Sequence, residues 1–172
     1  DKQYKAYAEA AEICGEKPLT IRTLDIGGDK ALPYLDLEKE ENPFLGYRAI
    51  RISMDMVPPF KTQIRAILRA GAHGNVRMMF PMIATIEELV KARKLVSECM
   101  EELEAEGKTF DKEMLVGMMI ETPASVLLAD EFAEMADFFS IGTNDLTQYI
   151  MAADRGNSKV ASLYDPSSAA VT

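Results

Sequence analysis

Apolar and charged positions along the chain fall into short and long segments that alternate. The short segments are runs of β-branched residues, leucine and methionine, which predict strands over 19–24, 76–80, 114–120 and 137–141. The longer segments mix charged and apolar residues, which predicts helices over 2–15, 44–53, 59–70, 85–106, 123–135 and 144–152. Strands that alternate with helices predict an α/β fold with a parallel sheet covered by helices.

Two architectures fit this order of elements: a doubly wound sheet or a (β/α)8 barrel. The chain contains neither GxGxxG nor GxxxxGKS/T, so no nucleotide-binding loop favours the doubly wound sheet. A complete barrel takes about 250 residues, whereas this chain has 172 and does not begin with methionine. We therefore expect residues 1–172 to form one domain, a partial (β/α)8 TIM barrel, that is a piece of a longer protein.

Composition argues against several classes of protein. Charged residues make up 27% of the chain and hydrophobic residues 48%, which is typical of a soluble folded protein. No apolar run of about 18 residues predicts membrane insertion, and no signal peptide is visible. The net charge of −9 argues against non-specific nucleic-acid binding, but not against a small anionic substrate. Cys14 and Cys99 lack metal-ligand spacing, which favours reduced thiols and a cytoplasmic location.

Two acidic residues each follow an apolar run. Glu121 follows the run at 114–120, and Asp145 follows the run at 137–141 by a few residues. Their spacing of 24 residues fits one strand–helix–strand step, which would bring both carboxylates to the same end of a parallel sheet. Such a pair, with arginines nearby, can hold a hard divalent cation and an anionic substrate. Each residue taken alone could instead be a helix cap or a turn residue.

Other candidates have simpler alternatives. Arg22 alternates with apolar residues in a predicted strand, so an ionic or functional partner is expected for it. Arg48 lies on a predicted helix and, by pattern alone, would belong to a solvated face. The pair Gly27-Gly28 could bind phosphate through backbone N–H groups, although a loop with positive φ is the commoner reason for such a pair. His73 is expected to be a turn residue.

Several strings resemble one family along nearly the whole chain. They are RTLDIGGDK at 22–30, EENPFLGYRAIR at 40–51, MFPMI at 79–83, ETPA at 121–124, FFSIGTNDLTQY at 138–149 and DRGN at 154–157. In these strings the chain resembles enzyme I of the bacterial sugar phosphotransferase system, the phosphoenolpyruvate–protein phosphotransferases. Pyruvate phosphate dikinase and phosphoenolpyruvate synthase belong to the wider family. The first two strings are more similar to enzyme I than to either of those.

The resemblance implies a site and a reaction. Glu121 and Asp145 would bind Mg²⁺. Arg22, Arg48 and Arg155 would hold the phosphate and carboxylate of phosphoenolpyruvate, and Asn144 would contact the substrate beside Asp145. The parent enzyme would transfer the phosphoryl group from phosphoenolpyruvate to its own histidine, on a separate N-terminal domain. A histidine-containing phosphocarrier protein would then receive the group for sugar uptake.

The chain also departs from the family pattern. It lacks the domain with the phosphoryl-accepting histidine and the cysteine on the seventh strand that protonates the product, so no catalytic residue is assigned within it. By the resemblance it holds about the third to sixth strands of the barrel, and we expect it to be inactive alone. Half a barrel has unpaired edges and exposed apolar area, so we expect self-association, as a homodimer.

Two alternatives remain open. The chain could belong to a related barrel enzyme that acts on phosphoenolpyruvate or pyruvate, such as a dikinase, a synthase or a carbon–carbon lyase. It could also be a non-catalytic fragment whose only activity is self-association.

Overall fold

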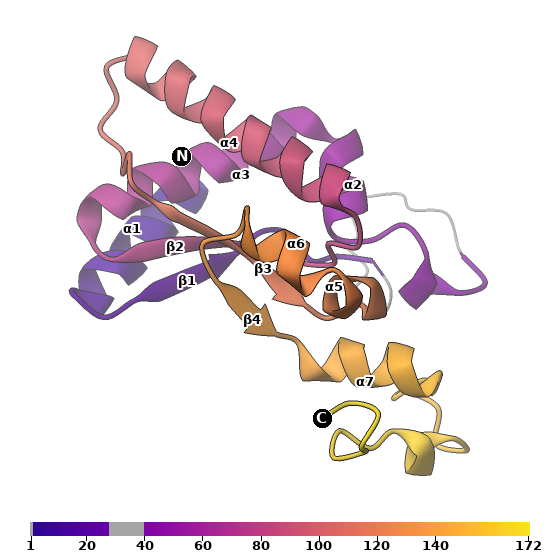
Figure 1. The fold of residues 1–172 in the computed structure, drawn as a ribbon. Helices are drawn as coiled ribbons and strands as arrows, with labels where there is room; N and C mark the ends of the chain where they lie inside the picture. Colours follow the sequence, from indigo (N-terminus) through magenta and orange to yellow (C-terminus); the bar gives the residue numbers. More distant parts are fainter. Residues whose placement is uncertain (1, 28–39) are drawn as a thin grey trace.

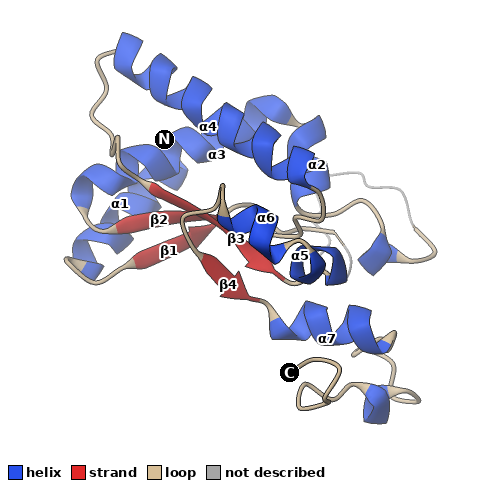
Figure 2. Cartoon of the chain, in the orientation of Figure 1, coloured by secondary structure: helices blue, strands red, loops and turns tan. Residues whose placement is uncertain are grey.

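The computed structural model describes residues 2–27 and 40–172 of the chain. Four strands form one parallel sheet in the order of the sequence: β1 (Leu19–Arg22), β2 (Val76–Phe80), β3 (Leu115–Ile120) and β4 (Phe139–Ile141). The sheet is curled (Figures 1 and 2). The described residues therefore form an α/β fold with a half-barrel sheet, as the sequence predicts.

The helices occupy the segments between the strands. Their bounds are α1 (Lys2–Cys14), α2 (Ile50–Asp55), α3 (Val57–Ala70), α4 (Ile86–Ala105), α5 (Pro123–Leu127), α6 (Ala129–Ala133) and α7 (Thr143–Met151), with short 3-10 turns η1 (Pro43–Leu45), η2 (Gly71–His73) and η3 (Ala161–Leu163). Helices α1, α3 and α4 lie on one side of the sheet, and α3 packs against both of the others (Figure 1). No helix within residues 2–27 and 40–172 is long and apolar enough to cross a membrane.

Side chains alternate between the two faces of the sheet. Met78 and Phe80 of β2 and Val116 and Met118 of β3 join the buried core beneath the helices. Arg22, which is paired in register with Met79, points to the opposite face of the sheet. The helix-covered face of the sheet therefore holds the core, and the charged side chain of Arg22 lies on the opposite face.

Two predicted helices were wrong in extent. The helix expected over 44–53 begins only at Ile50, because the Ala49 N–H donates to the Ile26 carbonyl (2.9 Å) and Ala49 adopts φ 51°. That tertiary hydrogen bond holds the preceding backbone outside a helix. The helix expected over 123–135 is divided at Leu128, whose φ of −105° and ψ of 20° end α5 before α6 begins.

Helix starts follow recognisable local chemistry. The two prolines at 58 and 59 lie in the first turn of α3, where a missing N–H removes no helical hydrogen bond. Helix α4 begins with a capping box: the Thr85 side chain accepts from the Glu88 N–H (3.2 Å), and Glu88 Oε2 accepts from the Thr85 N–H (3.0 Å). These signals place the helices that flank β2.

Adjacent residues of α4 provide a test of this packing. Leu89 is fully buried, with 0% of its surface exposed, whereas Val90 is 49% exposed. We expect Leu89→Ala to lower the free energy of unfolding by about 2–5 kcal/mol, because it leaves a cavity in the core. Val90→Ala should change it by no more than about 0.5 kcal/mol. Urea denaturation followed by circular dichroism measures both; equal losses in the two variants would contradict the assigned face of α4.

Candidate functional site

The carboxyl ends of three of the four strands bring charged side chains to one edge of the sheet. Arg22 ends β1, Glu121 directly follows β3, and Asp145 lies in the first turn of α7, just after β4. Because the strands are parallel neighbours, these ends share one edge. Glu121 is 1% exposed and Asp145 7% exposed, so both carboxylates are removed from water. With Asp25 and Arg48, these residues are called here the carboxyl-edge cluster.

Arg48 connects the cluster. Its Nη2 forms ion pairs with Asp25 Oδ1 (3.1 Å) and Asp145 Oδ2 (3.4 Å), and Asp25 Oδ2 is paired with Arg22 Nη2 (3.3 Å). Burial opposes the charge of Arg48, but Asp145, Tyr149 and Asp25 outweigh this effect and raise its pKa above the usual value. Arg48 therefore stays charged, and it does not lie on a solvated helix face.

A glycine allows Arg48 to reach this position. Gly27 has φ +94°, and a Cβ built there would lie 2.6 Å from Arg48 Cβ and 2.7 Å from the Tyr47 carbonyl oxygen. Only glycine permits both that backbone conformation and that close approach. Gly27 therefore has the positive φ that was expected of a loop glycine, while Gly28 lies outside the described residues.

Glu121 is held by backbone from a neighbouring strand connection. Its Oε1 accepts from the Met82 N–H (2.6 Å), and Met82 adopts φ 59°, an uncommon value for a residue with a side chain. Gly142 lies against it, since a Cβ at that position would be 2.7 Å from Glu121 Oε2. Helix α5 is capped by the Thr122 side chain, which accepts from the Ser125 N–H (3.0 Å). Helix capping thus does not account for Glu121.

The two carboxylates retain capacity for a further ligand. Burial raises the pKa of Glu121; the Met82 hydrogen bond opposes this, and the charges of Asp145 and Asp25 add to it. Asp145 Oδ1 is buried and has no hydrogen-bond partner among the described residues, and the α7 N-terminus has no side-chain cap. Buried acceptors of this kind are normally satisfied. A cation would satisfy the Asp145 Oδ1 acceptor and offset the charge of the Glu121 carboxylate, whereas the free N–H groups of α7 would need an acceptor.

An aromatic ring beside the cluster contacts two arginines. The guanidinium carbons of Arg48 and Arg155 lie 5.7 Å and 5.8 Å from the centroid of the Phe44 ring. The Tyr149 hydroxyl accepts from Arg48 Nη1 (3.1 Å) and donates to the Phe44 carbonyl. The Arg155 N–H donates to Gln148 Oε1 (3.1 Å). Helix α7 and the η1 segment therefore hold the Arg48 guanidinium group and the backbone of Arg155 near the same aromatic ring.

Asn144 is the sequence-predicted residue that the structure does not join to this network. It is exposed, and its Oδ1 accepts from the Tyr164 hydroxyl (3.1 Å). Three contributors were missed from sequence: Asp25, Tyr149 and Phe44. Asp25 follows β1 closely, as Glu121 follows β3, and Tyr149 lies four residues after Asp145, hence on the same helix face. Those two signals were available; nothing in the local pattern marks Phe44.

Within the described residues, no group of three or more His, Cys, Asp or Glu side chains could hold a metal ion. A cation at this edge would therefore have to take some of its ligands from water or substrate. Neither cysteine serves the site. Cys99 lies on α4, where burial raises its thiol pKa to about 11.

The Glu121 environment predicts a pH dependence of stability. A raised pKa in the folded state means that folded protein holds a proton more tightly than unfolded protein. Stability therefore falls as pH rises from the unfolded value, about 4.3, through the higher folded value. In EDTA, at pH values above this window, we expect the Glu121→Gln variant to be more stable than the parent chain. At pH values below it, the two proteins should be equally stable.

Thermal unfolding at a series of pH values measures this, with the exposed Glu113→Gln as the control that should track the parent chain. A stability difference that stays constant across pH would contradict the expected burial effect.

Comparison with known proteins agrees with this architecture. Residues 1–172 match the family model described as PEP-utilising enzyme, PEP-binding domain. Over 171 residues, the chain is 54% identical to a phosphoenolpyruvate-protein phosphotransferase of Latilactobacillus sakei, 53% to one of Geobacillus stearothermophilus and 52% to one of Bacillus subtilis (strain 168). Each match covers 99% of this chain and 30% of the relative's length. The chain therefore belongs to the family of PEP-utilising enzymes, through their PEP-binding domain.

Proposed function

We propose that this chain supplies most of the phosphoenolpyruvate and Mg²⁺ site of a phosphoenolpyruvate–protein phosphotransferase. The single observation that carries the proposal is the carboxyl-edge cluster, in which two buried carboxylates lie beside two arginines at the ends of adjacent parallel strands. The names of relatives that are 52–54% identical support the same reaction. The strands would be the third to sixth of an eight-stranded barrel.

The arginines suit the substrate. Phosphoenolpyruvate carries a phosphate and a carboxylate, and planar guanidinium groups bind such oxygens two at a time. In the proposed site Arg22, Arg48 and Arg155 bind these two groups, with Phe44 and Tyr149 fixing the orientation of the guanidinium groups. Asn144 would have to leave Tyr164 to contact the substrate.

Glu121 and Asp145 would hold Mg²⁺. The residues fit this ion, because Asp145 Oδ1 is a buried acceptor without a described partner and burial raises the pKa of Glu121. Mg²⁺ commonly uses one or two carboxylates and takes its remaining ligands from water and substrate oxygens. When bound, it would neutralise charge that develops on the transferring phosphoryl group.

The phosphoryl acceptor is proposed to lie outside this chain. His73 is the single histidine in the sequence, and it is engaged by Glu12 Oε1 (2.9 Å) and the Tyr4 hydroxyl (2.9 Å), neither of which belongs to the carboxyl-edge cluster. Transfer to an enzyme histidine, and then to a histidine phosphocarrier, would therefore need an imidazole from another domain. We expect the 172-residue chain to bind ligand without releasing pyruvate.

Titration calorimetry tests the binding site directly. We expect phosphoenolpyruvate to bind the chain in the presence of Mg²⁺ and to bind more weakly in EDTA. Glu121→Gln and Asp145→Asn should each weaken the Mg²⁺-dependent binding by about tenfold or more, equivalent to about 1.4 kcal/mol. The exposed Glu113→Gln should leave binding unchanged. Absence of heat, or heat that Glu121→Gln does not alter, would favour a non-catalytic fragment.

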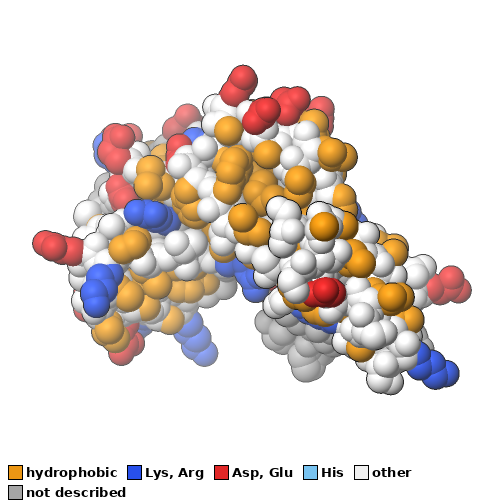
Figure 3. All heavy atoms as spheres, turned by 60° about the horizontal axis from the view of Figure 1, so that its bottom comes forward, with side chains coloured by type: hydrophobic (Ala, Val, Ile, Leu, Met, Phe, Trp, Pro, Cys, Tyr) orange, Lys and Arg blue, Asp and Glu red, His pale blue; other side chains and the backbone are white. Residues whose placement is uncertain are grey.

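We also propose that the chain self-associates through the β4 edge. Strand β4 ends the described sheet, and on it Phe139 is 38% and Ile141 68% exposed. Figure 3, in which the bottom of Figure 1 comes forward, shows many hydrophobic side chains on that face among a few charged ones. An unpaired strand with apolar side chains is a favourable surface for a second copy.

Light scattering over a range of concentrations measures this association. We expect the parent chain to form dimers and Ile141→Lys to be largely monomeric, because a charge on an edge strand opposes pairing. Ile13→Lys changes an equally apolar, exposed residue on α1 and should not reduce dimer formation. A monomeric parent chain at high concentration would contradict the proposal.

A further inference from the structure

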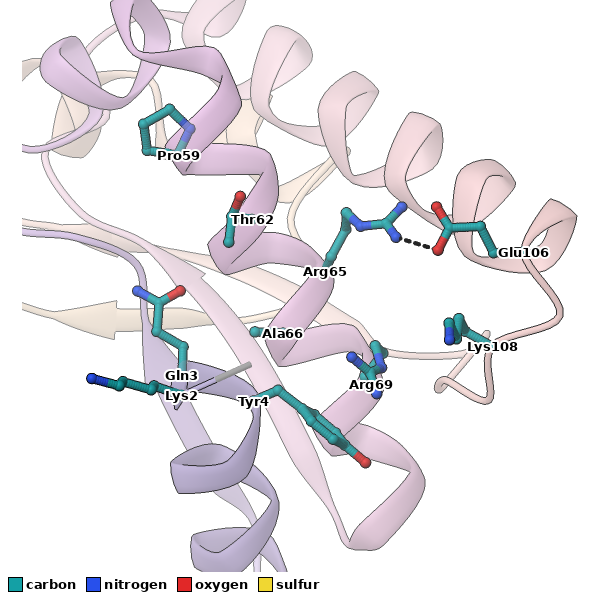
Figure 4. Close-up of a pocket in the computed structure, with 10 residues that line it drawn as sticks. All are labelled: Lys2, Gln3, Tyr4, Pro59, Thr62, Arg65, Ala66, Arg69, Glu106 and Lys108. Atoms are coloured by element: carbon teal, nitrogen blue, oxygen red, sulfur yellow. Dashed lines mark hydrogen bonds and ion pairs between the residues drawn. The ribbon is translucent and has the colours of Figure 1, made fainter.

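A hollow on the surface lies among the helices, apart from the carboxyl-edge cluster. It has a volume of about 820 Å³ and is formed by α1, α3 and the chain at the end of α4. Figure 4 shows Arg65, Arg69 and Lys108 along one side, Lys2 and Gln3 on the other, and Tyr4 beneath. None of the residues that line it belongs to the cluster proposed to bind phosphoenolpyruvate.

Of the four basic side chains that line the hollow, one is paired with acids among the described residues and three are not. Arg65 is neutralised by Glu106 (2.7 Å) and Glu102 (3.0 Å). Among the residues that the structure describes, no side chain forms an ion pair or hydrogen bond with the charged groups of Lys2, Arg69 or Lys108. The chain as a whole has more acidic residues (28) than basic residues (19). A group of basic side chains without acidic partners among the described residues is therefore unusual for this chain. Local positive potential is therefore a feature of this hollow.

Arg69 is also held in place. Its guanidinium carbon lies 3.8 Å from the centroid of the Tyr4 ring. The Tyr4 hydroxyl is hydrogen-bonded to His73 Nε2 (2.9 Å), and His73 Nδ1 is hydrogen-bonded to Glu12 Oε1 (2.9 Å). Stacking uses the face of a guanidinium group and leaves the N–H donors on its edge for an anion. Arg69 is thus oriented before any ligand arrives.

We propose that this hollow binds a small phosphate-bearing anion through Arg69 and Lys108. The fixed fork of an arginine matches two phosphate oxygens, and a lysine adds a point charge. The volume exceeds that of a phosphate group, so an organic part can be accommodated against Ala66 and Pro59. This site needs no metal and does not rest on the function proposed for the carboxyl-edge cluster.

Amide chemical shifts of the ¹⁵N-labelled chain test the proposal, with inorganic pyrophosphate as the probe and EDTA present throughout. We expect saturable shifts around Tyr4, Arg69 and Lys108, with a Kd of about 1 mM or tighter. Sodium chloride at equal ionic strength should not reproduce them. Arg69→Gln and Lys108→Gln should each weaken binding by at least about threefold, and the double variant by about tenfold.

The matched control is Lys112→Gln, which removes a nearby exposed lysine that is paired with Glu104 and does not line the hollow. It should leave the Kd unchanged. Shifts confined to the surroundings of Arg22 and Arg48 would overturn the proposal, as would equal weakening by Lys112→Gln. Arg69 also packs on Tyr4, so the melting temperature of Arg69→Gln is measured as well. A lower melting temperature with an unchanged Kd, together with an unchanged Kd in Lys108→Gln, would show that Arg69 is only a packing residue and that the proposal is wrong.

Discussion

A buried guanidinium must be neutralised where it lies, and Arg48 imposes this requirement on the carboxyl edge of the sheet. It is 1% exposed and is paired with Asp25 from the end of β1 and Asp145 from α7. Loss of one partner from a buried ion pair typically costs about 3–5 kcal/mol. The ion pairs therefore hold together segments far apart in sequence, and they arrange the polar face from which a site can be built.

The same arrangement leaves some oxygen atoms of the carboxyl-edge cluster without a hydrogen-bond or ionic partner among the described residues. Arg48 compensates one oxygen of Asp145, while the other oxygen has no partner among the described residues. Glu121 is buried beside like charges and is held by a single backbone N–H. Such groups lower stability in the absence of a ligand and gain most when a cation arrives, which is a common relation between stability and function.

Much of the fold could be predicted from sequence because it rests on local periodicity. The runs at 76–80 and 114–120 are nearly the observed strands β2 and β3, and the order of strands follows from their alternation with helices. The helix expected over 44–53 failed because a long-range hydrogen bond from Ala49 to Ile26 overrides local propensity. Tertiary contacts of that kind leave no periodic signal in the sequence.

The site was predictable to a different degree. Glu121 and Asp145 could be paired by their spacing and by the ends of apolar runs. An ionic partner for Arg22 could be expected from its place in a strand, and Asp25 is such a partner. The roles of Arg48 and Arg155 depended on resemblance, since Arg48 by pattern alone belongs to a solvated face and is in fact buried. Asp25 can bridge Arg22 and Arg48 because the neighbouring Gly27 packs closely against Arg48, a contact between segments far apart in sequence.

The contact of the Phe44 ring with both Arg48 and Arg155 has a consequence for recognition. A shift of either guanidinium group that moves the ring would also change the surroundings of the other. Fragments of a bifunctional anion, each engaging one arginine, would therefore not have independent affinities, and their separate binding free energies would not sum to that of the joined molecule. In the proposed site, the shared ring would couple the binding of one end of the anion to the binding of the other.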